Sequence, residues 1–234
     1  LTDGAIIVPF GSAQDHKRAY DGDRGPNTGG MGAYSPAPFE TPEFQALVRD
    51  TVFAPTLREL ARRGIDYRGV LYAGLMLTAG GPKVLEFNCR FGDPETQAIL
   101  PRIRGDLIPL LEACIEGALP ADAVACSPEA CACVVMAAEG YPGSVRKGDA
   151  IAGLEQAGAR EGVVVFHAGT KIEKGTPVTA GGRILGVTAL GRDLAHSVAR
   201  AYEAAADIAF SGAWFRRDIA AKGLRRAGGA ATGA

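Results

Sequence analysis

The sequence predicts an α+β protein built from antiparallel sheets with helices, arranged as two domains and a short tail. Helix signatures and a hairpin pattern occupy the first half, whereas short β runs separated by glycines fill the second. With 234 residues, of which 47% are hydrophobic and 22% charged, the chain has enough apolar material for two modest cores. We expect the domains at residues 1–117 and 118–222, with a flexible tail at residues 223–234.

The first domain is expected to begin with a short strand over Ala5–Pro9 and a long loop. The stretch Phe10–Pro38 holds six glycines and three prolines, too many breakers for regular structure. A helix follows over Pro42–Arg63, because Thr41 supplies an N-cap hydroxyl directly before a proline. Pro55 predicts a kink within this helix.

A hairpin and two further helices complete the first domain. The runs Gly69–Thr78 and Lys83–Asn88 flank an Ala-Gly-Gly-Pro turn, the pattern of an antiparallel hairpin. Asp93-Pro94-Glu95 repeats the order of cap, proline and acid, so a helix is expected to start there. Asp106–Gly117 predicts another helix.

The second domain is expected to be mostly β and closed by one helix. Its predicted strands are Ala130–Ala138, Gly162–His167, Pro177–Thr179 and Arg183–Leu190. Asp193 would then cap a helix with one apolar stripe. The stripe consists of Leu194, Val198, Ala201, Ala205 and Ile208.

Charge and cysteine usage favour small-molecule partners in a reducing cytoplasm. The 25 Lys and Arg residues almost cancel the 26 Asp and Glu residues, so no overall field would attract nucleic acid or a membrane surface. The five cysteines are odd in number and form no C-x-x-C pair, which indicates buried thiols rather than disulfides or zinc ligands. No apolar run reaches the roughly 18 residues of a membrane helix. Because the chain starts Leu1-Thr2-Asp3-Gly4 without Met, we expect that residue 1 is not the natural start.

A polar row along one predicted strand is the first candidate site. If Val84–Arg90 is a strand, Glu86, Asn88 and Arg90 share one face, and Leu85, Phe87 and Cys89 share the other. Two oxygen ligands on one strand face could hold Mg²⁺ together with nucleotide phosphates, and a guanidinium beside them could stabilise a transferring phosphoryl group. From these residues alone, an exposed strand with a polar outer face remains the alternative.

Two polar loops and one histidine are weaker candidates. Asp21–Pro36 contains five glycines but matches neither the Walker A spacing nor the dinucleotide fingerprint, so either an anion-binding loop or a flexible surface loop is possible. Gln14–Arg18 packs an acid, an imidazole and two cations after the first strand, where a solvated turn is the alternative. His167 ends a predicted strand, and a structural histidine is the alternative there. Lys171–Gly175 could suggest a biotin or lipoyl hairpin, but a charged turn is the preferred interpretation.

Six segments together resemble the phosphoribosylamine-glycine ligase family, also called glycinamide ribonucleotide synthetases. They lie in order between about Gly4 and about Asp218. The segments are Gln14–Pro36, Tyr72–Met76, Leu85–Gln97, Val134–Gly143, His167–Thr170 and Gly181–Gly191.

The resemblance implies the C-terminal part of an ATP-grasp domain, followed by a small β-rich domain. It implies that ATP phosphorylates the glycine carboxylate and that the amine of 5-phosphoribosylamine attacks the acyl phosphate. The products are glycinamide ribonucleotide, ADP and phosphate, in purine synthesis. By the same match, the metal would be Mg²⁺ or Mn²⁺ bound by Glu86 and Asn88, and Arg90 and Asp93 would be catalytic. Substrate and phosphate binding would involve Asp15, His16, Lys17, Arg18, Asn27, Thr28, Gly29, Gly30, Met31, Gly32 and His167.

The chain departs from the family in length. Family members are nearly twice as long, so the N-terminal domain and the first half of the ATP-grasp domain would be missing, and the isolated 234 residues are expected neither to bind ATP tightly nor to turn over. Two alternatives remain: another ATP-grasp carboxylate-amine ligase or carboxylase, and a non-catalytic module of the same fold. The Asp15–Arg18 and Gly25–Pro36 segments argue against the first. The trio Glu86, Asn88 and Arg90 argues against the second.

Overall fold

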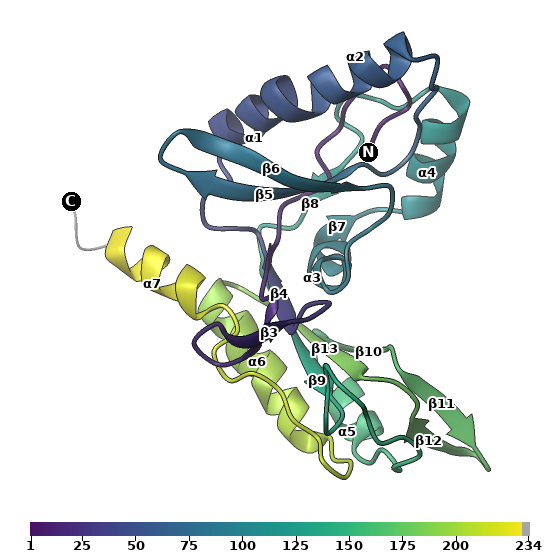
Figure 1. Ribbon diagram of the computed structural model, residues 1–234, viewed down its shortest axis with the longest axis vertical. Coiled ribbons are helices and arrows are strands. Elements are labelled where there is room, and N and C mark those ends of the chain that lie inside the picture. Colours follow the sequence, from purple (N-terminus) through teal and green to yellow (C-terminus); the bar gives the residue numbers. More distant parts are fainter. Residues whose placement is uncertain (231–234) are drawn as a thin grey trace. The chain divides into compact units, whose positions relative to one another are not determined.

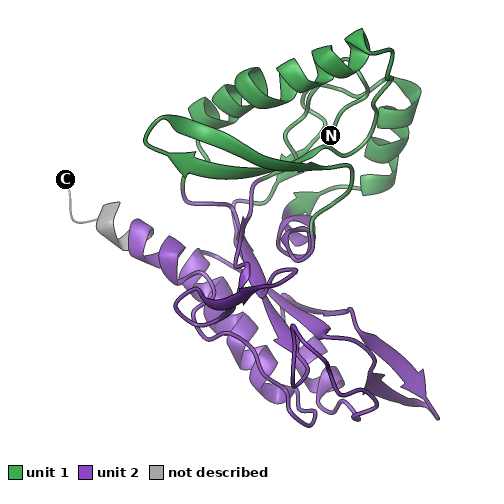
Figure 2. Ribbon diagram, in the orientation of Figure 1, with its two compact units in different colours: residues 1–11, 39–92, 103–127 green, residues 12–38, 93–102, 128–234 purple. Residues whose placement is uncertain are grey.

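The structure of the protein is a computed structural model that describes residues 1–230. The chain divides into two compact units, which Figure 2 shows in green and purple. Unit 1 contains residues 1–11, 39–92 and 103–127, and unit 2 contains residues 12–38, 93–102 and 128–234. The units are therefore interleaved along the chain, and each is assembled from three segments.

Unit 1 contains a long helical segment, which Figure 1 labels α1 and α2. Helix α1 (Pro42–Val48) begins as predicted, because the Thr41 hydroxyl accepts a hydrogen bond from the Phe44 N–H. A π-helical turn, η1 (Arg49–Phe53), connects it to α2 (Ala54–Arg62). Pro55 has no N–H to donate to an i−4 carbonyl, and a π turn directly before it accommodates that loss.

The predicted hairpin is confirmed in unit 1. Strands β5 (Tyr72–Thr78) and β6 (Gly81–Asn88) pair antiparallel, with an irregularity between Gly74 and Leu75. Helix α4 (Leu107–Glu116) is also confirmed, with Asp106 as N-cap and the left-handed Gly117 as C-cap. A short pair, β7 (Ile103–Arg104) and β8 (Ala125–Cys126), completes the unit.

The start of the chain differs from prediction. Ala5–Pro9 forms no strand, and only isolated bridges join Thr2 to Ile7 and to Gly69. The Asp3 carboxylate accepts hydrogen bonds from the Ala5 and Ile6 N–H groups, a local turn that competes with strand pairing. Leu1 and Val8 instead enter the small core of unit 1 with residues of α4 and the segment after it.

Unit 2 is organised around one antiparallel sheet of five strands in the order β1-β4-β9-β13-β10. Its strands are β1 (Gln14–Asp15), β4 (Gly32–Ser35), β9 (Ala130–Ala137), β13 (Arg183–Gly191) and β10 (Val163–His167). Helix α6 (Leu194–Asp207) packs against this sheet, with Asp193 as N-cap. The predicted stripe is confirmed at Val198, Ala201 and Ala205, which are buried.

The prediction that Phe10–Pro38 lacks regular structure is wrong. This stretch supplies β1 and β4 to the five-stranded sheet and forms a second hairpin, β2 (Arg18–Tyr20) with β3 (Arg24–Asn27). All four residues of β4 are buried, because the strand lies between β1 and β9. Tertiary pairing therefore overrides the glycine-rich local sequence.

Short elements complete unit 2. They are α3 (Glu95–Ile99), the 3₁₀ turn η2 (Leu100–Arg102), α5 (Leu154–Gly158), β11 (Thr170–Glu173), β12 (Thr176–Thr179) and α7 (Ala221–Ala230). Helix α7 occupies most of the range that was expected to be a flexible tail, and residues 231–234 lie outside the described part of the chain. Among residues 1–230, no helix is both long and apolar enough to cross a bilayer. The five cysteines are free thiols, of which three are buried as expected while Cys89 and Cys126 are exposed.

Candidate functional site

The predicted metal ligands lie near the end of β6 in unit 1. Glu86 and Asn88 are two residues apart on this strand, so their side chains project from the same face. Glu86 is exposed and Asn88 half-buried. Gly74 pairs with Glu86, and a Cβ at Gly74 would lie 3.0 Å from Glu86 Cγ, so this glycine leaves room beside the carboxylate.

Arg90 lies beyond the strand rather than on it. Strand β6 ends at Asn88, and Cys89 and Arg90 form a bend. The Arg90 side chain is exposed, and its Nη1 donates a hydrogen bond of 2.9 Å to the carbonyl of Phe91. The predicted row of three therefore reduces to two strand residues followed by an arginine in the bend.

The other side of β6 is not covered within unit 1. Leu85 is 65% exposed and Phe87 41% exposed, so this apolar row is largely open in the part of the chain that the structure describes. The buried core of this unit lies elsewhere, around Leu1, Val8, Cys114 and Leu119.

The oxygen donors of Glu86 and Asn88 fit a hard divalent cation. Magnesium is usually held by one or two protein oxygens together with substrate phosphates and water. Within the described residues, no group of three or more His, Cys, Asp or Glu side chains could hold a metal. The pair therefore suits a shared site, in which ligand oxygens complete the coordination.

The second set of predicted residues begins at β1 in unit 2. The Asp15 side chain is only 9% exposed, and Lys17 Nζ lies 2.7 Å from its Oδ2. Burial and the nearby charge of Glu95 raise the pKa of Asp15 to about 6, although Lys17 opposes that rise. Glu95, which lies in α3 and is itself buried, was not among the predicted site residues.

His16 is buried, and both of its ring nitrogens contact backbone groups. Nε2 accepts a hydrogen bond from the Ala220 N–H at 3.1 Å, so Nδ1 carries the proton that is donated to the Gly32 carbonyl at 3.1 Å. Burial, and then the charge of Arg216, lower the pKa of His16 to about 4. The imidazole is therefore neutral and holds β1 against the C-terminal segment.

A buried arginine extends this connection to the β2–β3 hairpin. The Arg216 side chain is 1% exposed, pairs with Asp218 and Asp23, and donates a hydrogen bond to the Arg18 carbonyl. The Asp218 Oδ2 also accepts a hydrogen bond from the Gly22 N–H at 2.9 Å. Burial would raise the pKa of Asp218, but the hydrogen bonds from Arg216 and the Gly22 N–H outweigh it and lower that pKa to about 2. Arg216 was not among the predicted site residues.

The glycine-rich turn does not present free amides to an anion. The N–H groups of four successive residues, 28 to 31, donate in order to the Lys17 carbonyl, the Tyr141 hydroxyl, the Thr28 hydroxyl and the His16 carbonyl. The glycines are required by close packing instead. A Cβ at Gly30 would lie 2.3 Å from Pro94 Cδ, and one at Gly32 would lie 2.6 Å from the Cys133 carbonyl oxygen.

Asp93 does not cap a helix as predicted. Helix α3 starts at Glu95, with Pro94 in the cap position and no side-chain cap bond. The Asp93 Oδ1 accepts hydrogen bonds from Gln97 Nε2 at 3.0 Å and from Arg183 Nη1 at 3.2 Å. Asp93 is therefore oriented by side chains from α3 and β13.

The remaining predicted residues divide by exposure. Met31 is fully buried and contributes to the core rather than to a binding surface. Asn27 is exposed at the end of β3, and Arg18 Nη1 donates to the Gly25 carbonyl. His167 is exposed, and its Nδ1 lies 3.0 Å from the Thr170 hydroxyl.

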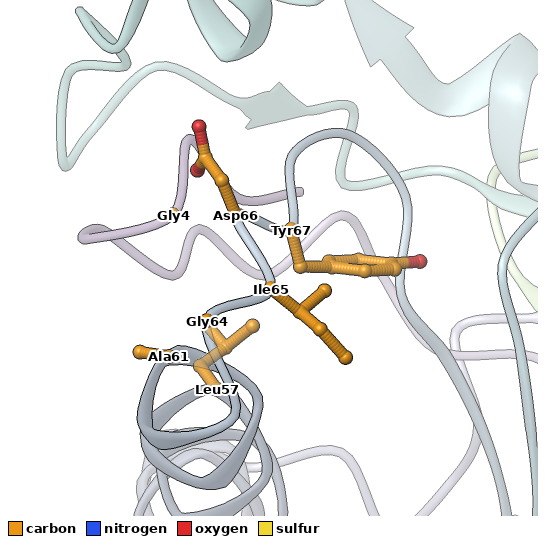
Figure 3. A pocket seen from close by; sticks show the side chains of 7 residues that line it. All are labelled: Gly4, Leu57, Ala61, Gly64, Ile65, Asp66 and Tyr67. Atoms are coloured by element: carbon orange, nitrogen blue, oxygen red, sulfur yellow. The ribbon is translucent and has the colours of Figure 1, made fainter.

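A small pocket in unit 1 is separate from all of these residues (Figure 3). Its volume is about 280 Å³, and its lining residues are Gly4, Leu57, Ala61, Gly64, Ile65, Asp66 and Tyr67. Asp66, the charged residue of the lining, already forms an ion pair with Arg68 at 3.0 Å. The pocket therefore offers no unpaired charge for a ligand.

Comparison with known proteins defines the class as ATP-grasp. A family model described as "Phosphoribosylglycinamide synthetase, ATP-grasp (A) domain" matches residues 1–96, and one described as "Phosphoribosylglycinamide synthetase, C domain" matches residues 131–222. The crystal structure of the Kluyveromyces lactis urea carboxylase has a TM-score of 0.61 and 16% identity, covering 92% of this chain and 18% of that one. At this identity the likeness shows the fold alone.

Two relatives narrow the class to one family. A phosphoribosylamine-glycine ligase from Synechocystis is 53% identical over 96% of this chain and 54% of its own length. The crystal structure of the Thermotoga maritima phosphoribosylamine-glycine ligase has a TM-score of 0.79 and 37% identity, covering 92% of this chain and 52% of that one. The chain belongs to the phosphoribosylglycinamide synthetase family, which confirms the resemblance, and it spans about half the length of the curated relatives it matches.

Proposed function

We propose that the longer protein to which this chain belongs joins glycine to 5-phosphoribosylamine at the expense of ATP. The products would be glycinamide ribonucleotide, ADP and phosphate. The observation that carries this proposal is the match of both family models along one chain, over residues 1–96 and 131–222. Identity of about 50% to relatives named phosphoribosylamine-glycine ligase supports the same substrates.

The first chemical step would be phosphoryl transfer to the glycine carboxylate. A carboxylate oxygen attacks the γ-phosphorus of ATP, the bond to the β-γ bridging oxygen breaks, and ADP leaves with that electron pair. A divalent ion, Mg²⁺ or Mn²⁺, would neutralise phosphate charge when bound. Glu86 and Asn88 would hold it, since their oxygens share one face of β6. The exposed Arg90 would stabilise charge on the transferring group, and Asp93 would help orient the reactants.

The second step would be attack of the phosphoribosylamine nitrogen on the acyl carbon. The carbon–oxygen bond to phosphate breaks, phosphate leaves, and the nitrogen loses a proton as the amide forms. We assign the shaping of the substrate pockets to the Asp15–Arg18 segment, the Asn27–Gly32 turn and His167. His16 and Met31 would act by holding the backbone in place, because both are buried.

We also propose how this chain relates to the whole protein. Residues 1–117 would belong to the ATP-grasp domain, residues 118–222 would form the C-terminal β-rich domain, and the rest of the longer protein would cover the exposed apolar side of β6. The partners would be small molecules, without nucleic acid or membrane, and the location would be cytoplasmic. The 234 residues alone would be inactive and would bind ATP weakly.

The test is ADP release by the full-length protein with each substrate omitted in turn. We expect release that requires both ATP and glycine, with glycinamide ribonucleotide detected by mass spectrometry when phosphoribosylamine is supplied. Bicarbonate-dependent release without glycine would instead support a carboxylase. Titration calorimetry of the 234-residue chain should show no micromolar affinity for ATP.

A further inference from the structure

Arg183, the first residue of β13, connects two segments that the proposed function uses. Its Nη1 lies 3.0 Å from the Gly29 carbonyl oxygen, 3.0 Å from the Asp93 carbonyl oxygen and 3.2 Å from Asp93 Oδ1. The Gly30 carbonyl oxygen is 3.4 Å away. One guanidinium nitrogen therefore joins the glycine-rich turn to the corner at Asp93.

Gly29 and Gly30 have no side chain, which allows Arg183 and Pro94 to pack directly against them. A Cβ at Gly29 would lie 3.0 Å from Arg183 Cζ, 3.0 Å from Nη2 and 3.3 Å from Nε, so the guanidinium packs directly against this glycine. On the next residue, a Cβ at Gly30 would lie 2.3 Å from Pro94 Cδ and 2.8 Å from Asp15 Oδ1. The turn is thus closely packed by Arg183, Pro94 and Asp15.

Tyr141 adds a second contact to the same turn. Its hydroxyl accepts a hydrogen bond from the Gly29 N–H at 3.1 Å. Its ring packs on Gly182, where a Cβ would lie 2.3 Å from Tyr141 Cδ2. Gly182 directly precedes Arg183, so the start of β13 fixes both groups that hold Gly29.

We propose that Arg183 is a positioning residue for the ligase reaction, and that Tyr141 assists it. Arg183 holds the Gly29–Gly30 turn and the Asp93 carboxylate at a fixed separation, so that the side chains around them meet the reactants in one arrangement. The proposal rests on the proposed function for its catalytic consequence. It adds to that function a role for the C-terminal β-rich region, because Arg183 in this region sets the geometry of the Gly29–Gly30 turn.

The guanidinium of Arg183 can hold the turn and Asp93 together better than the ammonium group of a lysine could. Asp93 has a half-exposed side chain, so the ion pair by itself contributes little stability. The planar guanidinium also packs on a glycine, which a lysine cannot reproduce. Misplacement of a reacting group by about 1 Å can reduce a rate by about 100-fold, so loss of this contact should reduce turnover more than stability.

The experiment compares Arg183→Met, Arg183→Lys and Tyr141→Phe with Arg192→Met in the full-length protein. Arg192 follows the other end of β13, its side chain is 77% exposed, and it forms an ion pair with the adjacent Asp193. We expect Arg183→Met to lower kcat by about 10- to 100-fold, with the KM for ATP changed less than about threefold. Arg183→Lys should recover part of the lost kcat, and Tyr141→Phe should lower kcat several-fold. Arg192→Met should match the wild type.

Hydrogen exchange over residues 27–32 gives a second measurement that does not depend on activity. We expect faster exchange there in Arg183→Met than in Arg192→Met, with similar melting temperatures. A kcat of Arg183→Met within about twofold of that of Arg192→Met, or unchanged exchange over residues 27–32, would overturn the positioning role. An increased KM for ATP with kcat retained would also overturn it. If Arg183→Met fails to fold, Tyr141→Phe and Arg183→Lys decide the question by the same measurements. A wild-type protein without glycine-dependent ADP release would refute the proposed function, while the exchange result would still test the contact.

Discussion

Most of the predicted site residues lie at the end of β6 or in the glycine-rich segment from β1 to β4. The two regions differ in how many of their polar groups are already hydrogen-bonded within the protein. Glu86 on β6 and Arg90 in the bend after it are exposed, and β6 belongs to a sheet of two strands. The N–H groups of residues 28–31 and the ring of His16 are instead fully engaged by the protein.

This difference separates two ways in which a polar residue can serve a site. An exposed carboxylate on a regular strand can bind a ligand directly, because its lone pairs are not used by the fold. A buried histidine with two backbone partners cannot bind a ligand without breaking those bonds, so its contribution is to hold the segment. Substituting an exposed carboxylate of this type should lower activity, whereas substituting a buried histidine of this type should lower stability.

Among the charged residues, the largest effect on stability is expected from Arg216→Met. The arginine is 1% exposed, and its loss leaves the Asp23 and Asp218 carboxylates without their buried partner. We expect a loss of about 3 kcal/mol in the free energy of unfolding, measured by urea titration. Arg217→Met is the matched control, because Arg217 is exposed and stacks on Phe215 with its guanidinium 5.4 Å from the ring centre. A loss above about 1 kcal/mol in Arg217→Met, or equal losses of unfolding free energy in both variants, would contradict the difference between the buried and the exposed arginine.

A pH-dependent effect is expected from His16. Its pKa is about 4 in the folded protein and about 6.5 when unfolded, so between these values only the unfolded chain takes up the proton. Stability is therefore retained above pH 6.5 and decreases as the pH falls to 4, by at most about 3 kcal/mol. His16→Gln should remove this part of the slope, measured by urea titration from pH 7 to 4.5.

Asp15 acts in the opposite direction over nearly the same range. Its pKa is raised to about 6 in the folded protein, so its contribution is present below pH 3.8 and is lost as the pH rises through 6. For that reason the difference between wild type and variant, rather than the raw curve, isolates His16. His167→Gln is the control, since His167 is exposed. Parallel wild-type and His16→Gln curves would contradict the assignment of a buried neutral imidazole.

The smallest effect is expected from Leu85→Ser in the 234-residue chain. Leu85 is 65% exposed, so the change should cost less than about 0.5 kcal/mol. Leu185→Ala, at a residue 1% exposed, should cost about 2–5 kcal/mol in the same urea titration. In the full-length protein, Leu85→Ser should cost more than in the shorter chain if the rest of the protein covers β6. Equal small costs in both would contradict that coverage.

The sequence predicted elements best where local chemistry decides them. Thr41 and Asp193 cap their helices as expected, and the Ala-Gly-Gly-Pro turn forms the β5–β6 hairpin. The prediction from sequence failed for β4, because no local pattern reveals that Gly32–Ser35 lies between β1 and β9. Asp93 failed as a cap because Gln97 and Arg183 engage its carboxylate instead.

The candidate site was predictable by residue type but not by contact. The spacing of Glu86 and Asn88 placed both on one strand face without any tertiary information. Arg183 and Tyr141 were inside recognised motifs, yet their contacts to Gly29 span 154 and 112 residues of chain. Arg216 reaches the Arg18 carbonyl across 198 residues. Contacts of this sequence separation leave no periodic signal in a single sequence.

The most direct test of the central claim is the binding of Mn²⁺, in the presence of ADP, to the full-length protein with Glu86→Gln, followed by electron paramagnetic resonance. Glu112→Gln, at an exposed acid on α4, is the control. We predict that Glu86→Gln weakens Mn²⁺ binding at least about tenfold and lowers kcat at least about 100-fold, whereas the control changes neither. Unchanged Mn²⁺ affinity in Glu86→Gln would contradict the assignment of Glu86 as a metal ligand.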